Sequence, residues 1–148
     1  MTGFTTVKTD VKIGFVRLGN IGLPMCEALS NRVTNEIVVF DTNAAAVSSA
    51  VAKLRCTAAA SVAEVGARCS VVCIVVGDEP ALNSVVAGAD GLLEHMAPGG
   101  TLLVHSTVGA RTVIAHAQLA RQRSIQVIDA PVSGAGRRER RSANSRSW

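Results

Sequence analysis

The chain has 148 residues, 48% of them hydrophobic, and a mean hydropathy of +0.32, which is enough for one domain with a buried core but not for two. The net charge of +4 lies in residues 137–148, where five arginines stand against one glutamate, so residues 1–136 are neutral. A nucleic-acid-binding domain would spread its basic residues over a folded face, so this class of protein is not expected.

No apolar run reaches the ~18 residues that a membrane-spanning helix needs. The first ten residues also lack the order of a secretory signal, so we expect a cytoplasmic protein without a membrane segment. The four cysteines form no C-x-x-C pair, and neither a metal site nor a disulfide framework is expected from Cys26, Cys56, Cys69 and Cys73.

Hydrophobic periodicity predicts an alternation of short strands and helices. In chain order we expect a strand at 11–16, a helix at 20–32, a strand at 36–40, a helix at 44–54, an extended piece at 56–60, a helix opened by Ser61, a strand at 71–76, helical segments at 80–87 and 91–95, a strand at 101–105, a helix at 109–123 and a strand at 125–128. Glu64 follows Ser61 at the spacing of a capping box.

The predicted strands are apolar throughout, as in a parallel sheet covered on both faces. Their alternation with helices predicts an α/β fold, a doubly wound Rossmann-type parallel sheet in a single domain. Such sheets bind ligands at the carboxyl ends of their strands. We expect an N-terminal tail at 1–10, the folded domain at 11–136 and a basic disordered tail at 137–148.

The turn after the first strand carries two of the three glycines of a G-x-G-x-x-G fingerprint, because Arg17, Gly19 and Gly22 occupy the three positions. Gly19 would let the backbone approach a pyrophosphate, and Gly22 would let the helix pack close to the strand. Asp41 follows at the end of the next predicted strand, where a carboxylate accepts hydrogen bonds from a ribose and repels a 2′-phosphate. We therefore expect NAD rather than NADP. The alternative is a glycine turn that is only structural.

Four stretches carry a more specific signal: IGFVRLGNIGLPMCEAL from Ile13, VVFD ending at Asp41, HSTVGART from His105 and DAPVSGAG from Asp129. In this order they resemble the beta-hydroxyacid dehydrogenases, the group of 3-hydroxyisobutyrate dehydrogenase, tartronate semialdehyde reductase and 6-phosphogluconate dehydrogenase. The first and last stretches are the most distinctive of that family.

The resemblance implies hydride transfer between NAD(P) and the carbinol carbon of a small 3-hydroxy acid. It implies that Gly19, Asn20, Ile21 and Gly22 form the pyrophosphate turn and that Asp41 contacts the adenosine ribose. It further implies that Val75 and Val76 lie where the chain passes the cofactor after the fourth strand, and that Thr107 lies near the nicotinamide end. It also implies substrate-carboxylate contacts at Ser133 and Gly134, where a hydroxyl and exposed amides offer donors. Without the resemblance, a plain turn residue is the favoured interpretation of Ser133.

Arg17 departs from the family pattern, which has a glycine there. A side chain at a tight-turn glycine costs about 1–3 kcal/mol where the backbone angles disfavour it. The long side chain would also crowd the adenosine side of the site. An arginine near a pyrophosphate adds attraction, but we expect crowding to outweigh one partly solvated charge pair and to weaken cofactor binding.

The end of the chain is a larger departure. The resemblance implies a general-acid lysine and a helical C-terminal domain beyond Gly134, whereas this chain continues as AGRRERRSANSRSW. We therefore expect that the helical domain is absent and that the chain holds no catalytic residue. We also expect that the apolar surface exposed by the absence of this domain favours self-association. We interpret the Arg/Ser ending as a shifted reading frame or a truncated gene. The stretch VVGDEP at 75–80, where the family commonly has a Leu-Pro turn, is a smaller departure.

Two functions remain open. One is the NAD(P)-binding domain of a beta-hydroxyacid dehydrogenase that is inactive as this chain alone. The other is a degenerate nucleotide-binding or interaction module without catalysis. His105 is the histidine nearest the expected site, and a polar strand-end residue is its favoured interpretation over a catalytic group.

Overall fold

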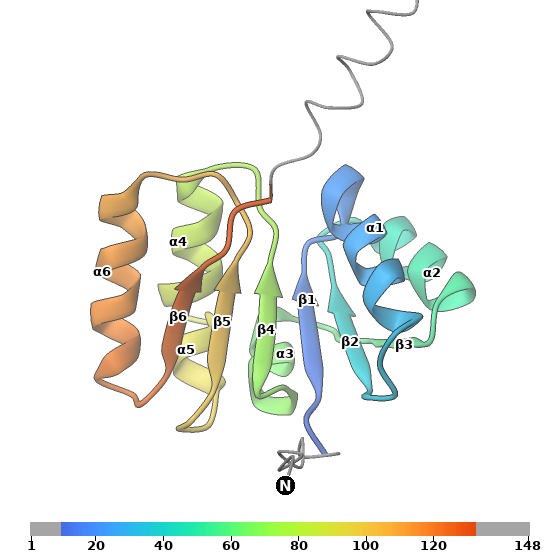
Figure 1. Cartoon of the computed structure of the whole chain (residues 1–148), viewed down its shortest axis with the longest axis horizontal. Coiled ribbons are helices and arrows are strands. Elements are labelled where there is room, and N and C mark those ends of the chain that lie inside the picture. The colour runs from blue at the N-terminus through green and yellow to red at the C-terminus, as the bar shows by residue number, and fades with distance from the viewer. Residues whose placement is uncertain (1–9, 133–148) are drawn as a thin grey trace, which may run out of the picture.

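Six short strands form one sheet with the order β3-β2-β1-β4-β5-β6 in the computed structural model, which describes residues 10–132 (Figure 1). All neighbouring strands pair in parallel. The order reverses between β1 and β4, which is the switch point of a doubly wound sheet. The predicted fold class is confirmed. The strands are β1 Ile13–Val16, β2 Ile37–Phe40, β3 Cys56–Ala58, β4 Val71–Ile74, β5 Thr101–Val104 and β6 Gln126–Asp129.

The helices alternate with the strands as the sequence predicts, and they differ from the predicted ranges only at their ends. They are α1 Gly19–Ser30, α2 Ala44–Lys53, α3 Val62–Arg68, α4 Glu79–Ala87, α5 Leu92–His95 and α6 Ala110–Arg121. Within residues 10–132, none of these helices is long and apolar enough to cross a membrane.

Three of the helices begin at a residue whose side chain accepts a hydrogen bond from the first turn. These residues are Asn43 before α2, Ser61 before α3 and Asp78 before α4. Glu64 reaches back to the amide of Ala60 at 2.6 Å rather than to that of Ser61, so the predicted capping box is shifted by one residue. Such caps satisfy amides that a helix leaves without partners.

Two apolar clusters lie on the opposite faces of the sheet. The face covered by α1 and α2 is filled by Phe15, Leu18, Cys26, Ile37, Val39, Ala50 and Cys73. The other face, where α3, α4 and α5 lie behind the sheet in Figure 1, holds a larger cluster that includes Val16, Val38, Val72, Ile74, Leu82, Leu92 and Leu102. Alternate residues of each central strand therefore enter different clusters. Burial raises the pKa of the Cys26 thiol to about 12, so this thiol stays protonated and packs as a small apolar group.

The edge strand β6 differs from the central strands. Ile128 pairs with Leu103 of β5 and so shares its face of the sheet, yet the Ile128 side chain is 45% exposed. The expectation that both faces of the sheet are covered holds for β1 but is wrong for β6. The physical reason is that α1 and α2, the helices on this face, pack over the other end of the sheet.

A buried histidine joins two helices on the larger cluster's side. The Nε2 atom of His116 in α6 donates to Oδ1 of Asn83 in α4 at 2.7 Å, and the side chain is 4% exposed. Its Nδ1 atom is buried and has no partner among the described residues. Burial penalises the charged imidazolium and lowers the pKa of His116 from its ordinary 6.5.

Acidification should therefore destabilise the fold through His116. The His116 imidazole is protonated near pH 6.5 in the unfolded chain and only at a lower pH in the folded chain. The contribution of neutral His116 to the free energy of unfolding is therefore full above pH 6.5 and is lost as the pH falls through the folded-state pKa. Urea unfolding at about pH 7.5 and about pH 5.5 measures the loss. His116→Gln should show a smaller loss than the parent chain, whereas His95→Gln, at an exposed position on α5, should match the parent. An equal loss in His116→Gln and the parent would contradict this account.

Candidate functional site

The turn from β1 to α1 lies at the switch point, at the carboxyl ends of the strands. Two of its residues have left-handed backbones, Arg17 at a φ of 71° and Gly19 at 53°. Glycine adopts this region freely, whereas arginine does so at a cost of about 1–2 kcal/mol. The turn is fixed to the neighbouring strand because the amide of Arg17 donates to the carbonyl of Phe40 at 2.9 Å.

Helix α1 begins in this turn without a side-chain cap, in contrast to α2, α3 and α4. Leu18 is its N-cap residue, no side chain accepts from its first turn, and that turn holds no acidic residue. The helix dipole and the amides of Gly19, Asn20 and Ile21 therefore make this end positive. A Cβ placed on Gly19 would meet no atom within 4 Å, so there is open space beside the turn. The arrangement suits an anionic group such as a phosphate.

Gly22 has a different role from Gly19. A Cβ on Gly22 would lie 2.6 Å from the carbonyl oxygen of Arg17 and 3.5 Å from the Cβ of Val75. A contact of 2.6 Å with a backbone atom cannot be accommodated unless the helix moves. Gly22 therefore allows α1 to pack directly against the ends of β1 and β4.

Asp41 follows β2 and is joined to this turn. Its Oδ2 accepts from the amide of Leu18 at 2.8 Å, and its Oδ1 accepts from the amide of Asn43 at 3.0 Å. Partial burial raises the pKa of the Asp41 carboxyl, but the hydrogen bonds from Asn43 and Leu18 and the charge of Arg17 outweigh it and hold the pKa below its ordinary value. The group is a carboxylate at neutral pH, held in a fixed orientation.

The side chain of Arg17 extends towards the end of β2. Its Nη1 donates to Oγ1 of Thr42 at 3.0 Å. Both residues line a cavity of about 410 Å³ between the carboxyl ends of β1 and β2 and helix α4, together with Phe40, Ala60, Ser61, Val62, Ala81, Ser84, Val85, Gly88, Ala89 and Asp90. A cavity of this size can hold a small ring system.

The chain after β4 closes the other side of the site. Val75 is half-buried beside Gly22, whereas the side chain of Val76 lies in the larger core cluster. The amide of Val76 donates to Oγ of Ser106 at 2.8 Å, which holds this segment against the end of β5. Thr107, one residue further, is exposed. Val75 and Thr107 therefore lie at the carboxyl edge, and Val76 can contribute only its backbone there.

Two further contacts at this edge were not predicted from the sequence. Oε1 of Glu79 accepts from the amide of Gly109 at 2.9 Å and so joins the start of α4 to the loop after β5. His105 donates from Nδ1 to the carbonyl of Ala130 at 2.9 Å, which leaves its buried Nε2 without a partner among the described residues. Both contacts join residues that are 25 or more positions apart in the chain, so no local sequence pattern predicts them.

Two predicted substrate contacts, Ser133 and Gly134, lie outside the described residues, as does the predicted boundary at 136. The two lysines of residues 10–132 lie away from the site. Lys12 precedes β1 and pairs with Glu36 at 3.1 Å, and Lys53 ends α2. Within this range no group of three or more His, Cys, Asp or Glu side chains could hold a metal ion.

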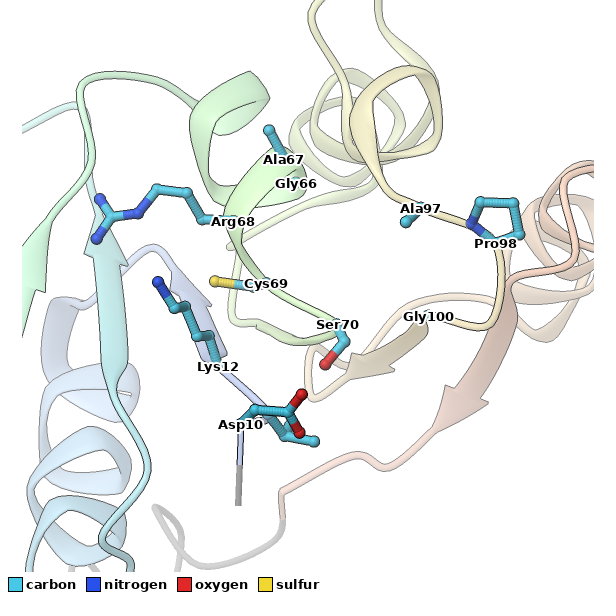
Figure 2. A pocket seen from close by; sticks show the side chains of 11 residues that line it. Asp10, Lys12, Gly66, Ala67, Arg68, Cys69, Ser70, Ala97, Pro98 and Gly100 are labelled. Atoms are coloured by element: carbon cyan, nitrogen blue, oxygen red, sulfur yellow. The ribbon is translucent and has the colours of Figure 1, made fainter. Parts of the chain in front are cut away.

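Another hollow has a volume of about 310 Å³. Lys12, Arg68, Ser70 and Gly100 are among the residues that line it (Figure 2). Lys12, Ser70 and Gly100 directly precede β1, β4 and β5. This hollow therefore lies at the amino ends of the strands. Arg68 pairs with Glu36 at 2.8 Å, as Lys12 does. Since these cations already have a carboxylate partner, and ligands of doubly wound sheets bind at the opposite edge, this hollow is not the candidate site.

A parallel sheet of this order, an uncapped helix at its switch point and a carboxylate on the adjacent strand together define a dinucleotide-binding domain. Comparison with known proteins agrees. Residues 12–144 match the family described as the NAD binding domain of 6-phosphogluconate dehydrogenase, and the chain belongs to this family. The resemblance found in the sequence is thereby confirmed.

Similar proteins include several oxidoreductases. An uncharacterized oxidoreductase of Mycobacterium tuberculosis is 35% identical over 123 residues, which is 83% of this chain and 41% of the relative. NAD-dependent L-serine dehydrogenase of Pseudomonas aeruginosa is 32% identical over the same shares of both chains. The crystal structure of 3-hydroxyisobutyrate dehydrogenase from Salmonella typhimurium has a TM-score of 0.77 at 27% identity, covering 87% of this chain and 44% of that one. This chain spans about two fifths of the length of these two curated relatives.

Glycine substitutions should separate the roles of the turn residues. Gly22→Ala should lower the free energy of unfolding by about 1–3 kcal/mol because its Cβ meets the Arg17 carbonyl. Gly19→Ala should cost about 1 kcal/mol from its left-handed backbone alone. Gly77→Ala is the control, since a Cβ there meets nothing within 4 Å. Urea unfolding measures all three, and equal stability of the Gly22 and Gly77 variants would be inconsistent with the packing described.

Proposed function

We propose that this chain is the dinucleotide-binding part of an oxidoreductase that acts on small 3-hydroxy acids. The observation that carries the proposal is the uncapped start of α1 at the switch point, with open space beside Gly19 and the carboxylate of Asp41 beyond it. When bound, the nicotinamide cofactor supplies or accepts a hydride. The residues of this chain bind and orient it.

Each part of the cofactor has a candidate set of contacts. The amides of Gly19, Asn20 and Ile21 are proposed to hold the pyrophosphate, while Gly22 keeps α1 close enough for them to do so. Asp41 is proposed to accept from the adenosine ribose. Val75, the backbone of Val76 and Thr107 are proposed to contact the cofactor towards its nicotinamide end, because they occupy the carboxyl ends of β4 and β5. Ser133 and Gly134 are proposed to hold the substrate carboxylate.

We propose NAD as the preferred cofactor. The Asp41 carboxylate keeps acceptor capacity beyond the hydrogen bonds from Leu18 and Asn43, because each carboxylate oxygen can accept two hydrogen bonds. A ribose 2′-hydroxyl can donate to that capacity. A 2′-phosphate is largely dianionic at neutral pH, so it mostly lacks a proton to donate and is repelled by the same charge.

We propose that the 148 residues bind cofactor without oxidising substrate on their own. A dehydrogenase needs a group that exchanges a proton with the substrate hydroxyl as hydride moves. Of the lysines in residues 10–132, Lys12 pairs with Glu36 at the amino edge of the sheet and Lys53 ends α2, so neither can serve at the carboxyl edge. Lys8 lies outside the described residues.

NADH titration by fluorescence tests this function. The chain should bind NADH, and Asp41→Ala should bind it about tenfold more weakly, since one charge-assisted hydrogen bond is removed. Glu94→Gln is the control, because Glu94 is an exposed carboxylate on α5 that pairs with Arg123. No NADH binding by a chain that folds would reject the function and favour the degenerate module. Oxidation of 3-hydroxyisobutyrate by the chain alone would contradict the proposed lack of turnover.

Two other sequence expectations stay predictions. Self-association would use apolar surface such as Ile128 on β6 and Val132 just after it, which are 45% and 40% exposed. A cytoplasmic location, as expected from the sequence, would fit a site for a soluble nicotinamide cofactor.

A further inference from the structure

The guanidinium of Arg17 lies in the part of the site where the adenosine ribose is expected. The backbone of Arg17 is left-handed, at a φ of 71°. The guanidinium donates to Thr42, which follows Asp41 at the end of β2. Arg17 and Thr42 line the cavity at this strand end, and the carboxylate of Asp41 lies next to Thr42 in the chain.

The charge of Arg17 partly offsets that of Asp41 before any ligand binds. Thr42 donates to Oδ1 of Asp41 at 3.4 Å and accepts from Arg17, so the hydroxyl links the two charged groups. The carboxylate also accepts from the amides of Leu18 and Asn43. The repulsion that an isolated carboxylate would exert on a second anion is therefore reduced.

The guanidinium also retains donors for such an anion. Among the described residues its partner is Thr42, which leaves most of its N–H groups available. Arg17 is the only arginine or lysine among the residues that line this cavity, and Asp90 is the only acid among them. A guanidinium presents a planar fork of donors that matches the oxygens of a phosphate.

We propose that Arg17 is a specificity residue that offers its guanidinium to a 2′-phosphate on the adenosine ribose and so narrows the preference for NAD(H) over NADP(H) that Asp41 sets. The proposal rests on the proposed dinucleotide binding. Arg17 and Asp41 act in opposite directions on the same ribose. The side chain that crowds the site for both cofactors thus favours the one with the additional phosphate.

Two small nucleotides isolate this effect. 5′-AMP and 2′,5′-ADP both carry the adenosine end, and they differ only by the 2′-phosphate. The measured quantity is the ratio of the two dissociation constants, obtained by calorimetry on the same protein. Changes in stability or backbone strain affect both constants equally, so they cancel in the ratio.

Three variants define the test. Arg17→Gln removes the charge and keeps a polar side chain at the left-handed position, and it should weaken 2′,5′-ADP about tenfold relative to 5′-AMP. Arg17→Lys keeps the charge but loses the planar fork of donors, so its ratio should lie between those of the parent and of Arg17→Gln. Arg32→Gln removes one positive charge from an exposed position in the loop after α1 and should leave the ratio unchanged.

The outcomes separate the inference from the function on which it rests. A ratio that is the same in the parent and in Arg17→Gln overturns the role of Arg17, while NADH binding still supports the proposed function. A shift of equal size in Arg32→Gln also overturns it, because the effect would then follow the net charge. Failure of both nucleotides and of NADH to bind any folded variant rejects the proposed function as well.

Discussion

The site depends on the close approach of α1 to the ends of β1 and β4. That approach is possible because Gly22 has no Cβ, since one would lie 2.6 Å from the carbonyl oxygen of Arg17. The left-handed backbones of Arg17 and Gly19 let the chain reverse within three residues, so the helix starts directly at the switch point. Asp41 completes the turn from the neighbouring strand by accepting the amide of Leu18. Strands β1, β2 and β4 thus together hold the free amides at the start of α1 in place.

The sequence predicts the fold well because the fold follows from local patterns. Short β-branched runs such as Val71–Ile74 are typical of buried strands, and the helix starts at Ser61 and Asn43 carry capping residues. It predicts the edge strand poorly, since periodicity does not say which neighbours cover β6. The apolar character of Ile128 suggested burial, and its side chain is 45% exposed because no helix on its face reaches that far within the described residues.

The sequence predicts the site only in part, for a similar reason. The spacing of Gly19, Gly22 and Asp41 locates the turn, but the contacts that hold it join loops far apart in the chain, such as Ser106 with Val76. Arg17 is the clearest example. From the sequence it is a side chain in a glycine position, and the expected consequence is crowding. The direction of the side chain depends on a φ of 71°, and the structure shows it bonded to Thr42 beside Asp41, which gives the same residue an electrostatic role.

The central claim is that a dinucleotide binds at the start of α1, at the carboxyl edge of the sheet. The most direct test is an amide NMR spectrum of the ¹⁵N-labelled chain, recorded while NADH is added. The account predicts that the amide signals of Gly19, Asn20 and Ile21 shift most and that those of Lys12, Ser70 and Gly100, in the hollow at the amino edge, stay in place. Shifts concentrated at the amino edge, with the α1 amides unmoved, would contradict it.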